Sequence, residues 1–141
     1  MPSEPNGERF GFAFDRPLPR PLRMLGIRPE TCYLLITTSR LDVRFGRWSV
    51  RTALDNVAGA EVTGPFSAWK VLGVHLSAAD RGLTFGTGTE QGVCIRFHRP
   101  VPGAEPTGLL RHPGLTLTLA DSPAAARRLQ EIASALHPVQ V

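Results

Sequence analysis

The sequence predicts a mainly β (α+β) fold, a single antiparallel barrel or roll of about seven strands capped by one C-terminal helix. Three observations predict it. Short segments with alternating apolar residues recur along the chain, Gly and Pro residues separate them, and helical periodicity is confined to the C-terminal end. The length of 141 residues is that of one domain, and a chain of this size needs no disulfide or metal ion to stay folded.

The strand patterns begin after a polar segment, residues 1–8, that we expect to be a disordered tail. Residues 9–14 place three phenylalanines on one face of a strand, which either joins the barrel or pairs with another copy of the chain. Residues 41–45 and 48–54 alternate in the same way around Gly46 and Arg47, so they are expected to form a hairpin. The other segments with strand patterns are 31–39, 56–65, 74–77, 82–87, 92–98 and 114–120.

Residues 9–141 are expected to form a single domain. Two segments interrupt its strands, and a third segment follows the last strand. Residues 16–30 carry prolines at alternate positions, which favours an extended arm that covers its own domain. Residues 99–114 are rich in Pro and Gly and are expected to form a long loop. Residues 122–137 predict an amphipathic helix, because their apolar side chains form one stripe that must pack on the sheet or in the barrel mouth.

The order of the elements and one local pattern resemble the bacterial pleckstrin-homology-like (PH-like) domains. The pattern is an aromatic residue ahead of an (I/L)-T-x-x-R-L strand, a hairpin ending in Gly, and a hydrophobic step into the next strand. The matching residues are Tyr33, Ile36, Thr37, Arg40, Leu41, Gly46, Leu54, Asn56 (in place of an acid) and Val57. The resemblance implies a PH-like barrel that serves as a platform for lipid headgroups, peptides or other domains, and rarely as an enzyme.

The resemblance also implies where a lipid would bind. Lipid-binding members carry Lys and Arg residues in the loop that joins their first two strands. The densest basic hairpin of this chain, residues 40–51, is expected to join later strands, which argues against phosphoinositide binding.

The net charge of +4 comes from 16 basic and 12 acidic residues, and the excess lies within residues 1–51. This balance is modest for nucleic-acid binding, which usually needs a dense basic stripe with interleaved aromatic residues. The first anion-binding candidates are Arg40, Arg44, Arg47 and Arg51. Their guanidinium groups suit phosphate or carboxylate, and the alternative is a solvated strand face whose charges discourage edge pairing.

A second group of anion-binding candidates comprises Arg96, His98, Arg111 and His112, which meet only if the loop between them returns beside its own start. The alternative is that these side chains contact solvent separately. Phe66 and Trp69 are candidates for an exposed interaction patch, or alternatively for the cap of a barrel end. Cys32 and Cys94 are expected to be small buried apolar residues.

These features favour a non-enzymatic binding or interaction module whose partner is a protein or a second copy of the chain. The first alternative is a peripheral sensor of anionic lipid or a phosphate ligand, and the second is a small-ligand carrier or enzyme with a site in the barrel mouth. No sequence motif for catalysis, metal binding or a cofactor is present. The polar N-terminus and the absence of a long apolar run predict a cytoplasmic protein without a membrane span.

Overall fold

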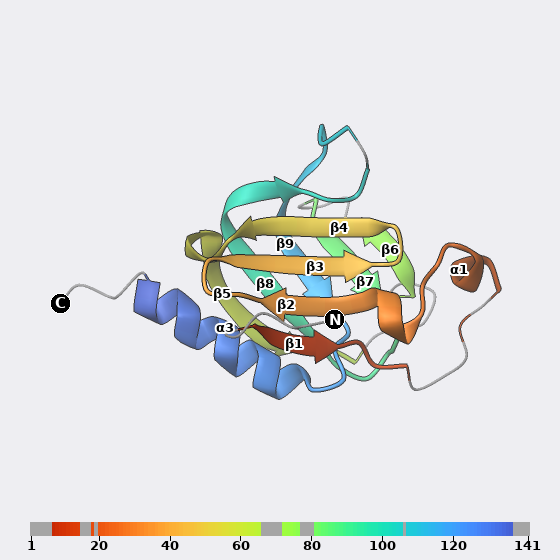
Figure 1. The fold of residues 1–141 in the computed structure, drawn as a ribbon, viewed down its shortest axis with the longest axis horizontal. Coiled ribbons are helices and arrows are strands. Elements are labelled where there is room, and N and C mark those ends of the chain that lie inside the picture. The colour runs from red at the N-terminus through yellow and green to blue at the C-terminus, as the bar shows by residue number, and fades with distance from the viewer. Residues whose placement is uncertain are drawn as a thin grey trace.

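Two β-sheets and one long helix make up the fold (Figure 1). The computed structural model describes residues 7–14, 18, 20–65, 72–76, 81–105 and 107–136. Within these residues the strands are β1 (Glu8–Gly11), β2 (Cys32–Ile36), β3 (Arg40–Phe45), β4 (Trp48–Ala53), β5 (Val57–Thr63), β6 (Gly73–Leu76), β7 (Leu83–Gly86), β8 (Gly92–Pro102) and β9 (Arg111–Leu117). The α-helices are α1 (Arg20–Met24) and α3 (Ser122–Leu136), and the 3-10 turns are Pro29–Thr31 and Leu54–Asn56.

The expected mainly β chain with a C-terminal helix is confirmed, whereas the closed barrel is not found. Among the described residues, nine strands form a four-stranded sheet, in the order β1-β2-β3-β4, and a five-stranded sheet, in the order β5-β8-β9-β7-β6. The sequence predicted antiparallel strands throughout, but the second sheet also contains one parallel pair. Strands β7 and β9 run parallel, because β8, which lies between them in the chain, pairs on the other side of β9.

The hairpin of β3 and β4 has the register that the alternation predicted. Its two-residue turn has Gly46 at a φ of +59°, as a type II′ turn requires at its first central position. Val43 pairs with Val50 on the buried face, and Asp42 pairs with Arg51 on the outer face. Strand β1 begins at Glu8 and pairs with β2, so this N-terminal strand is an edge strand of the first sheet.

The expectations for the two Pro-rich segments need correction. The arm at 16–30 is not extended throughout, because α1 lies within it. Leu18 and Ile27 are buried, as expected of an arm that covers its own domain. The expected loop at 99–114 is shorter at both ends, since β8 continues to Pro102 and β9 begins at Arg111.

The buried amide of Asn56 explains how β8 continues through its prolines. The strand is irregular between Arg96 and Val101, where its pairing with β9 shifts in register. Asn56 Oδ1 accepts a hydrogen bond from the Arg99 N–H at 2.7 Å, and Asn56 Nδ2 donates to the Arg99 carbonyl at 2.9 Å. A side chain thus satisfies both backbone groups that a neighbouring strand would otherwise pair with.

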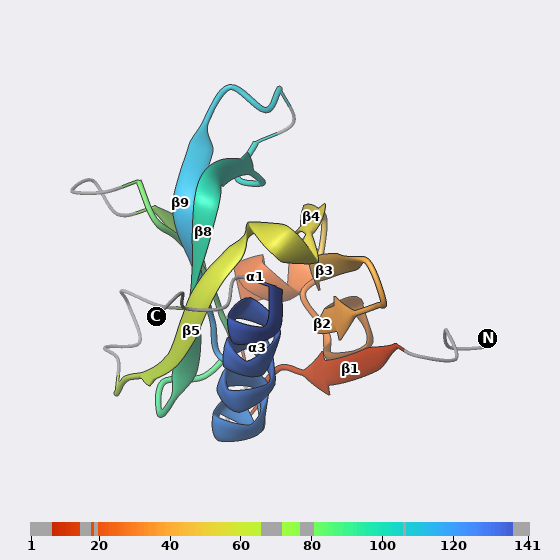
Figure 2. The ribbon, with the colours of Figure 1, turned by 90° about the vertical axis from the view of Figure 1, so that its left-hand side faces the viewer.

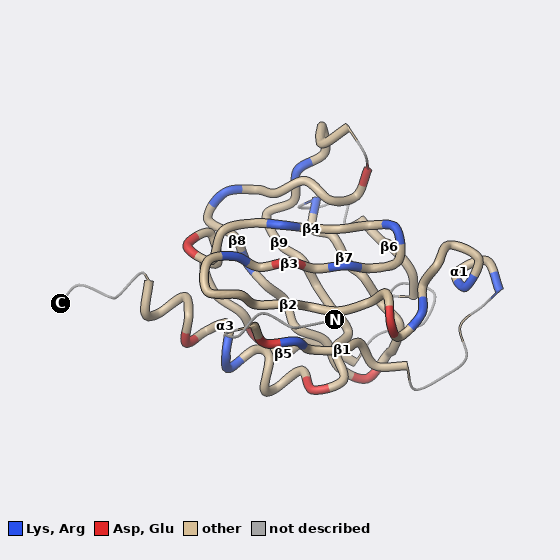
Figure 3. The backbone as a smooth tube through the Cα atoms, viewed as in Figure 1, with Lys and Arg blue, Asp and Glu red and all other residues tan. Residues whose placement is uncertain are grey.

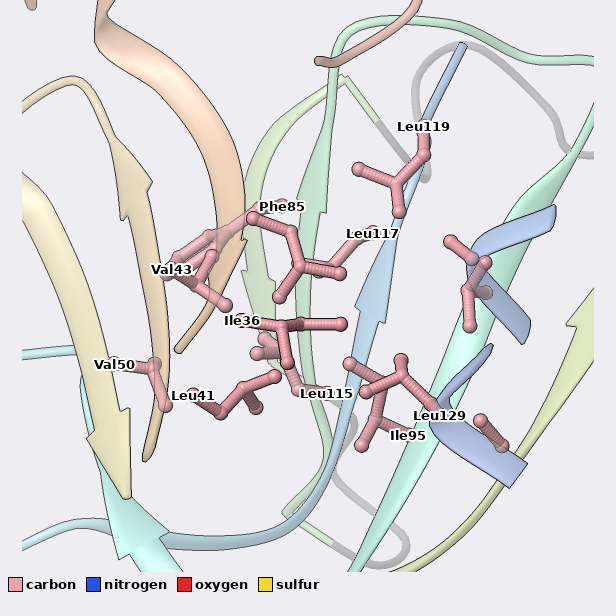
Figure 4. Packing of buried hydrophobic residues seen from close by; sticks show 14 of the residues in the cluster. Ile36, Leu41, Val43, Val50, Phe85, Ile95, Leu115, Leu117, Leu119 and Leu129 are labelled. Carbon is pink, nitrogen blue, oxygen red and sulfur yellow. The ribbon is translucent and has the colours of Figure 1, made fainter. Parts of the chain in front are cut away.

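The core lies between the two sheets, whose apolar side chains point toward one another (Figure 4). Three phenylalanine rings form its centre: Phe45 stacks on Phe85 with centroids 4.9 Å apart, and Phe12 lies 5.2 Å from Phe45. These rings and the surrounding aliphatic side chains pack together between the two sheets.

Helix α3 fills the gap between the free edges of β1 and β5 (Figure 2). The buried stripe of the helix includes Leu129 and Ile132, as the periodicity predicted. Polar contacts fasten each side of the helix. Arg128 Nε donates to Glu8 of β1 at 2.6 Å, and the Gln130 amide oxygen accepts the Ala60 N–H of β5 at 3.2 Å. The helix therefore packs on the free edge of β5, where Gln130 satisfies a backbone N–H, and reaches β1 through the Arg128–Glu8 ion pair.

Candidate functional site

Most of the arginines that the sequence singled out lie on strands β3 and β4 and in the turn between them (Figure 3). Alternation and register place side chains of four strands on the outer face of the first sheet. We call it the arginine face, and it comprises Arg9, Tyr33, Leu35, Arg40, Asp42, Arg44, Ser49 and Arg51, with Arg47 in the β3–β4 turn. The face thus carries five guanidinium groups and one carboxylate.

Asp42 lies between two of the four predicted anion-binding arginines and neutralises part of their charge. Arg40 Nε donates to one carboxylate oxygen at 2.9 Å, and Arg51 Nε donates to the other at 2.8 Å. The carboxylate is 15% exposed, whereas the Arg40 and Arg51 side chains are 45% and 70% exposed. These two ion pairs leave Arg40 and Arg51 less available to a ligand than Arg44 and Arg47. The sequence did not predict that the four arginines would differ in this way.

Arg44 and Arg47 have no carboxylate partner among the described residues. Arg44 Nε donates to the Gly46 carbonyl at 3.2 Å, which fixes the direction of its side chain. A shallow groove of about 430 Å³ runs beside both arginines, with Tyr33 and Ser49 also lining it. Asp42 and Arg51 line the same groove, so the hollow brings together the paired and the unpaired arginines of the face.

Arg9 and Tyr33 extend the arginine face, and sequence reasoning did not identify either as a site residue. The Arg9 guanidinium lies 4.3 Å from the centre of the Tyr33 ring, a cation–π contact. Arg44 is paired directly with Tyr33 across β2 and β3. The alternation of residues 9–14 contained the signal, since the phenylalanines point inward and Arg9 must then point outward.

The second predicted group of anion-binding residues does not converge. Arg96 donates to Glu61 of β5 at 3.1 Å, and His98 and Arg111 are exposed. His112 is 1% exposed, with its Nδ1–H donating to the Arg81 carbonyl at 2.8 Å. The four side chains thus lie in different surroundings, and no anion site is formed by them as a group.

The remaining residues that the sequence singled out are two aromatic residues and two cysteines. Phe66 and Trp69, the interaction candidates, lie outside the described residues. Cys32 is buried, and loss of hydration raises the pKa of its thiol. Cys94 is only half-buried, in contrast to the expectation. No group of three or more His, Cys, Asp or Glu side chains in the described ranges is arranged to hold a metal ion.

A further basic segment, which the sequence analysis did not single out, lies between the first two strands. The connection between β1 and β2 contains α1, whose surroundings carry Arg20, Arg23 and Arg28, all exposed. Met24, at the end of the helix, is 80% exposed. The basic hairpin of residues 40–51 joins β3 and β4, which are later strands as expected, and the connection between β1 and β2 is basic as well.

Comparison of the chain with protein-family models, with curated proteins and with solved structures finds no match. The relation to PH-like domains therefore stays a prediction from the sequence. None of the helices in the described part of the chain has the length and apolarity that a membrane-spanning helix requires.

Proposed function

We propose that the protein is a non-enzymatic interaction module whose arginine face binds an acidic segment of a partner protein. The observation that carries the proposal is the groove beside Arg44 and Arg47, two guanidinium groups without a carboxylate partner in the described residues. Guanidinium groups bind carboxylates through paired N–H donors, and Arg is enriched in protein interfaces for this reason.

The charge distribution favours a partner over a second copy of the chain. An antiparallel pairing of two arginine faces would bring guanidinium groups against guanidinium groups, with Asp42 already occupied by Arg40 and Arg51. Like charges placed opposite one another oppose association. A complementary segment instead supplies the carboxylates that Arg44 and Arg47 lack.

The proposal is tested with a fluorescent Glu-rich peptide and its Gln-containing analogue, titrated with the protein at low salt. We expect only the acidic peptide to bind, and Arg44→Gln to weaken its binding about fivefold or more, because an ionic hydrogen bond is lost. Arg96→Gln is the matched control, since it removes one positive charge from the second sheet, where Arg96 pairs with Glu61. Equal losses in the two variants would show that net charge alone governs binding.

Anionic membrane is the second candidate partner, and the connection between β1 and β2 favours it. Exposed Arg20 and Arg23 precede the exposed Met24 there, and basic residues beside an exposed apolar side chain suit contact with anionic headgroups. Arg20→Gln combined with Arg23→Gln is expected to reduce sedimentation with phosphatidylglycerol vesicles. A carrier or enzyme has less support, because aromatic rings fill the space between the sheets.

A further inference from the structure

The loop between β8 and β9 projects from the body of the molecule (Figures 1 and 2). It carries two exposed leucines. Leu109 is 85% exposed, the highest value for a large apolar side chain in the described residues, and Leu110 is 42% exposed. The two are adjacent and lie where the sequence predicted only a Pro/Gly loop. Apolar side chains gathered at a projecting tip indicate a contact that removes them from water.

The loop is held in this conformation by its own hydrogen bonds. Both oxygens of the Glu105 carboxylate accept bonds within the loop: one accepts the Thr107 N–H at 2.9 Å and the Thr107 hydroxyl, and the other accepts the Leu110 N–H at 3.0 Å. The hydrogen bond from the Thr107 hydroxyl, followed by that from the Leu110 N–H, lowers the pKa of Glu105. The carboxylate is therefore ionised at neutral pH and can accept these hydrogen bonds.

The base of the loop is anchored to β4. Trp48 Nε1 donates to the Ala104 carbonyl at 3.1 Å. Gly103 lies so close to Val50 that a Cβ on the glycine would come within 2.4 Å of a Val50 methyl group. These contacts hold the described residues on both sides of position 106, which lowers the conformational entropy lost when the leucines are bound.

Positive charge borders the loop. Arg111 is exposed at the start of β9, opposite Pro102. Arg47 lines a groove of about 600 Å³ that continues to Thr107 and Gly108. Neither arginine has a carboxylate partner among the described residues. The ionised Glu105 lines the same groove, so anionic headgroups at the leucines would meet two guanidinium groups and one carboxylate, which leaves a net positive charge.

We propose that the β8–β9 loop inserts Leu109 and Leu110 into the surface of an anionic lipid bilayer, with Arg47 and Arg111 contacting the headgroups. A projecting tip of two side chains covers far too little area for a stable protein interface, which needs roughly 1,200 Å² or more in total. A bilayer deforms around such a tip, so it accepts a shape that a protein surface does not match.

The expected binding is reversible. Removing one leucine side chain fully from water favours the bound state by roughly ten- to a hundredfold. Two leucines bury less hydrocarbon than a myristoyl chain, which alone gives only marginal anchoring. The insertion therefore needs the second, electrostatic contribution, and vesicles of phosphatidylcholine alone should bind the protein weakly.

The test is sedimentation of the full chain with phosphatidylcholine vesicles and with vesicles that also contain phosphatidylglycerol. We expect binding to the anionic vesicles, and a loss of at least about tenfold in the Leu109→Ser/Leu110→Ser variant. Leu136→Ser is the control, because Leu136 is 48% exposed on α3, away from the loop. Circular dichroism checks that each variant is folded.

This inference goes beyond the binding of an acidic protein segment and shares its lipid partner with the second candidate function. The same variants distinguish peptide binding by the arginine face, membrane contact through α1 and membrane insertion of the β8–β9 loop. The Leu109→Ser/Leu110→Ser variant should keep its affinity for the Glu-rich peptide, and Arg44→Gln should keep vesicle binding. The Arg20→Gln/Arg23→Gln variant tests α1 alone. The inference is overturned if the wild-type chain binds no vesicles, or if the leucine variant binds them as well as the Leu136→Ser control does.

Discussion

Asp42 shows how a single residue determines which arginines are available on the arginine face. Its two carboxylate oxygens each receive one guanidinium N–H, from Arg40 and from Arg51. Alternation along β3 predicted that these side chains share a face, but it did not indicate that one carboxylate would hold two of them. The distribution of free charge therefore depends on the register of β3 and β4, which aligns Asp42 with Arg51.

Replacement of Asp42 by Asn should strengthen the binding of an acidic peptide. The substitution removes a carboxylate that repels the ligand and releases two guanidinium groups, so we expect an increase in affinity of about two- to fivefold. Fluorescence anisotropy with the Glu-rich peptide measures it. Asp55→Asn is the control for net charge, because Asp55 pairs with Arg99 away from the arginine face. Unchanged affinity in Asp42→Asn would contradict the role assigned to the arginine face.

Individual elements were predictable where side-chain pattern and turn chemistry agree. Gly46 marked the turn of the β3–β4 hairpin, and the stripe containing Leu129 and Ile132 marked α3. Strand β8 was underestimated because Pro100 and Pro102 indicate a loop. Its backbone instead finds the Asn56 side chain, a contact between residues 43 positions apart that no local pattern reveals. The exposed leucines were missed for the same reason, since only the fixed loop geometry makes them project.

The contribution of α3 to stability should come from its buried stripe. Leu129 is fully buried, so Leu129→Ala is expected to lower the free energy of unfolding by about 2–5 kcal/mol, through lost burial and the cavity left behind. Urea denaturation followed by circular dichroism measures this change. In the same helix Leu136 is 48% exposed, and Leu136→Ala should cost less than about 1 kcal/mol. Similar losses in both variants would show that α3 does not pack as described.

At the scale of the whole molecule, the arrangement of the two sheets depends on contacts between residues that are far apart in the sequence. Strands β7 and β9 are parallel neighbours although β8 lies between them in the chain. The free edges of β1 and β5 are separated, and α3 joins them through Glu8 and Ala60. As a result the core is enclosed, while the arginine face and the β8–β9 loop lie on outer surfaces.

These two surfaces should respond differently to salt. The arginine face acts through exposed charges, whereas the loop acts through leucines as well as arginines. Between roughly 0.01 M and 1 M salt the Debye length falls from about 30 Å to about 3 Å. We therefore expect binding of the Glu-rich peptide to be lost across this range. High salt screens the attraction between the arginines and the anionic headgroups, but it does not screen the burial of apolar side chains. Binding to anionic vesicles should therefore fall only to the level seen with phosphatidylcholine alone.

This difference in salt dependence is measured by titrating the wild-type chain with the peptide and with both kinds of vesicle at several salt concentrations. The Leu109→Ser/Leu110→Ser variant supplies the matched control, since its remaining vesicle binding is electrostatic and should vanish at high salt. If wild-type and variant chains lose vesicle binding in parallel, the leucines do not enter the bilayer and the arginines alone account for the attraction. If the wild-type chain keeps a salt-resistant fraction that the variant lacks, the fraction measures the contribution of Leu109 and Leu110.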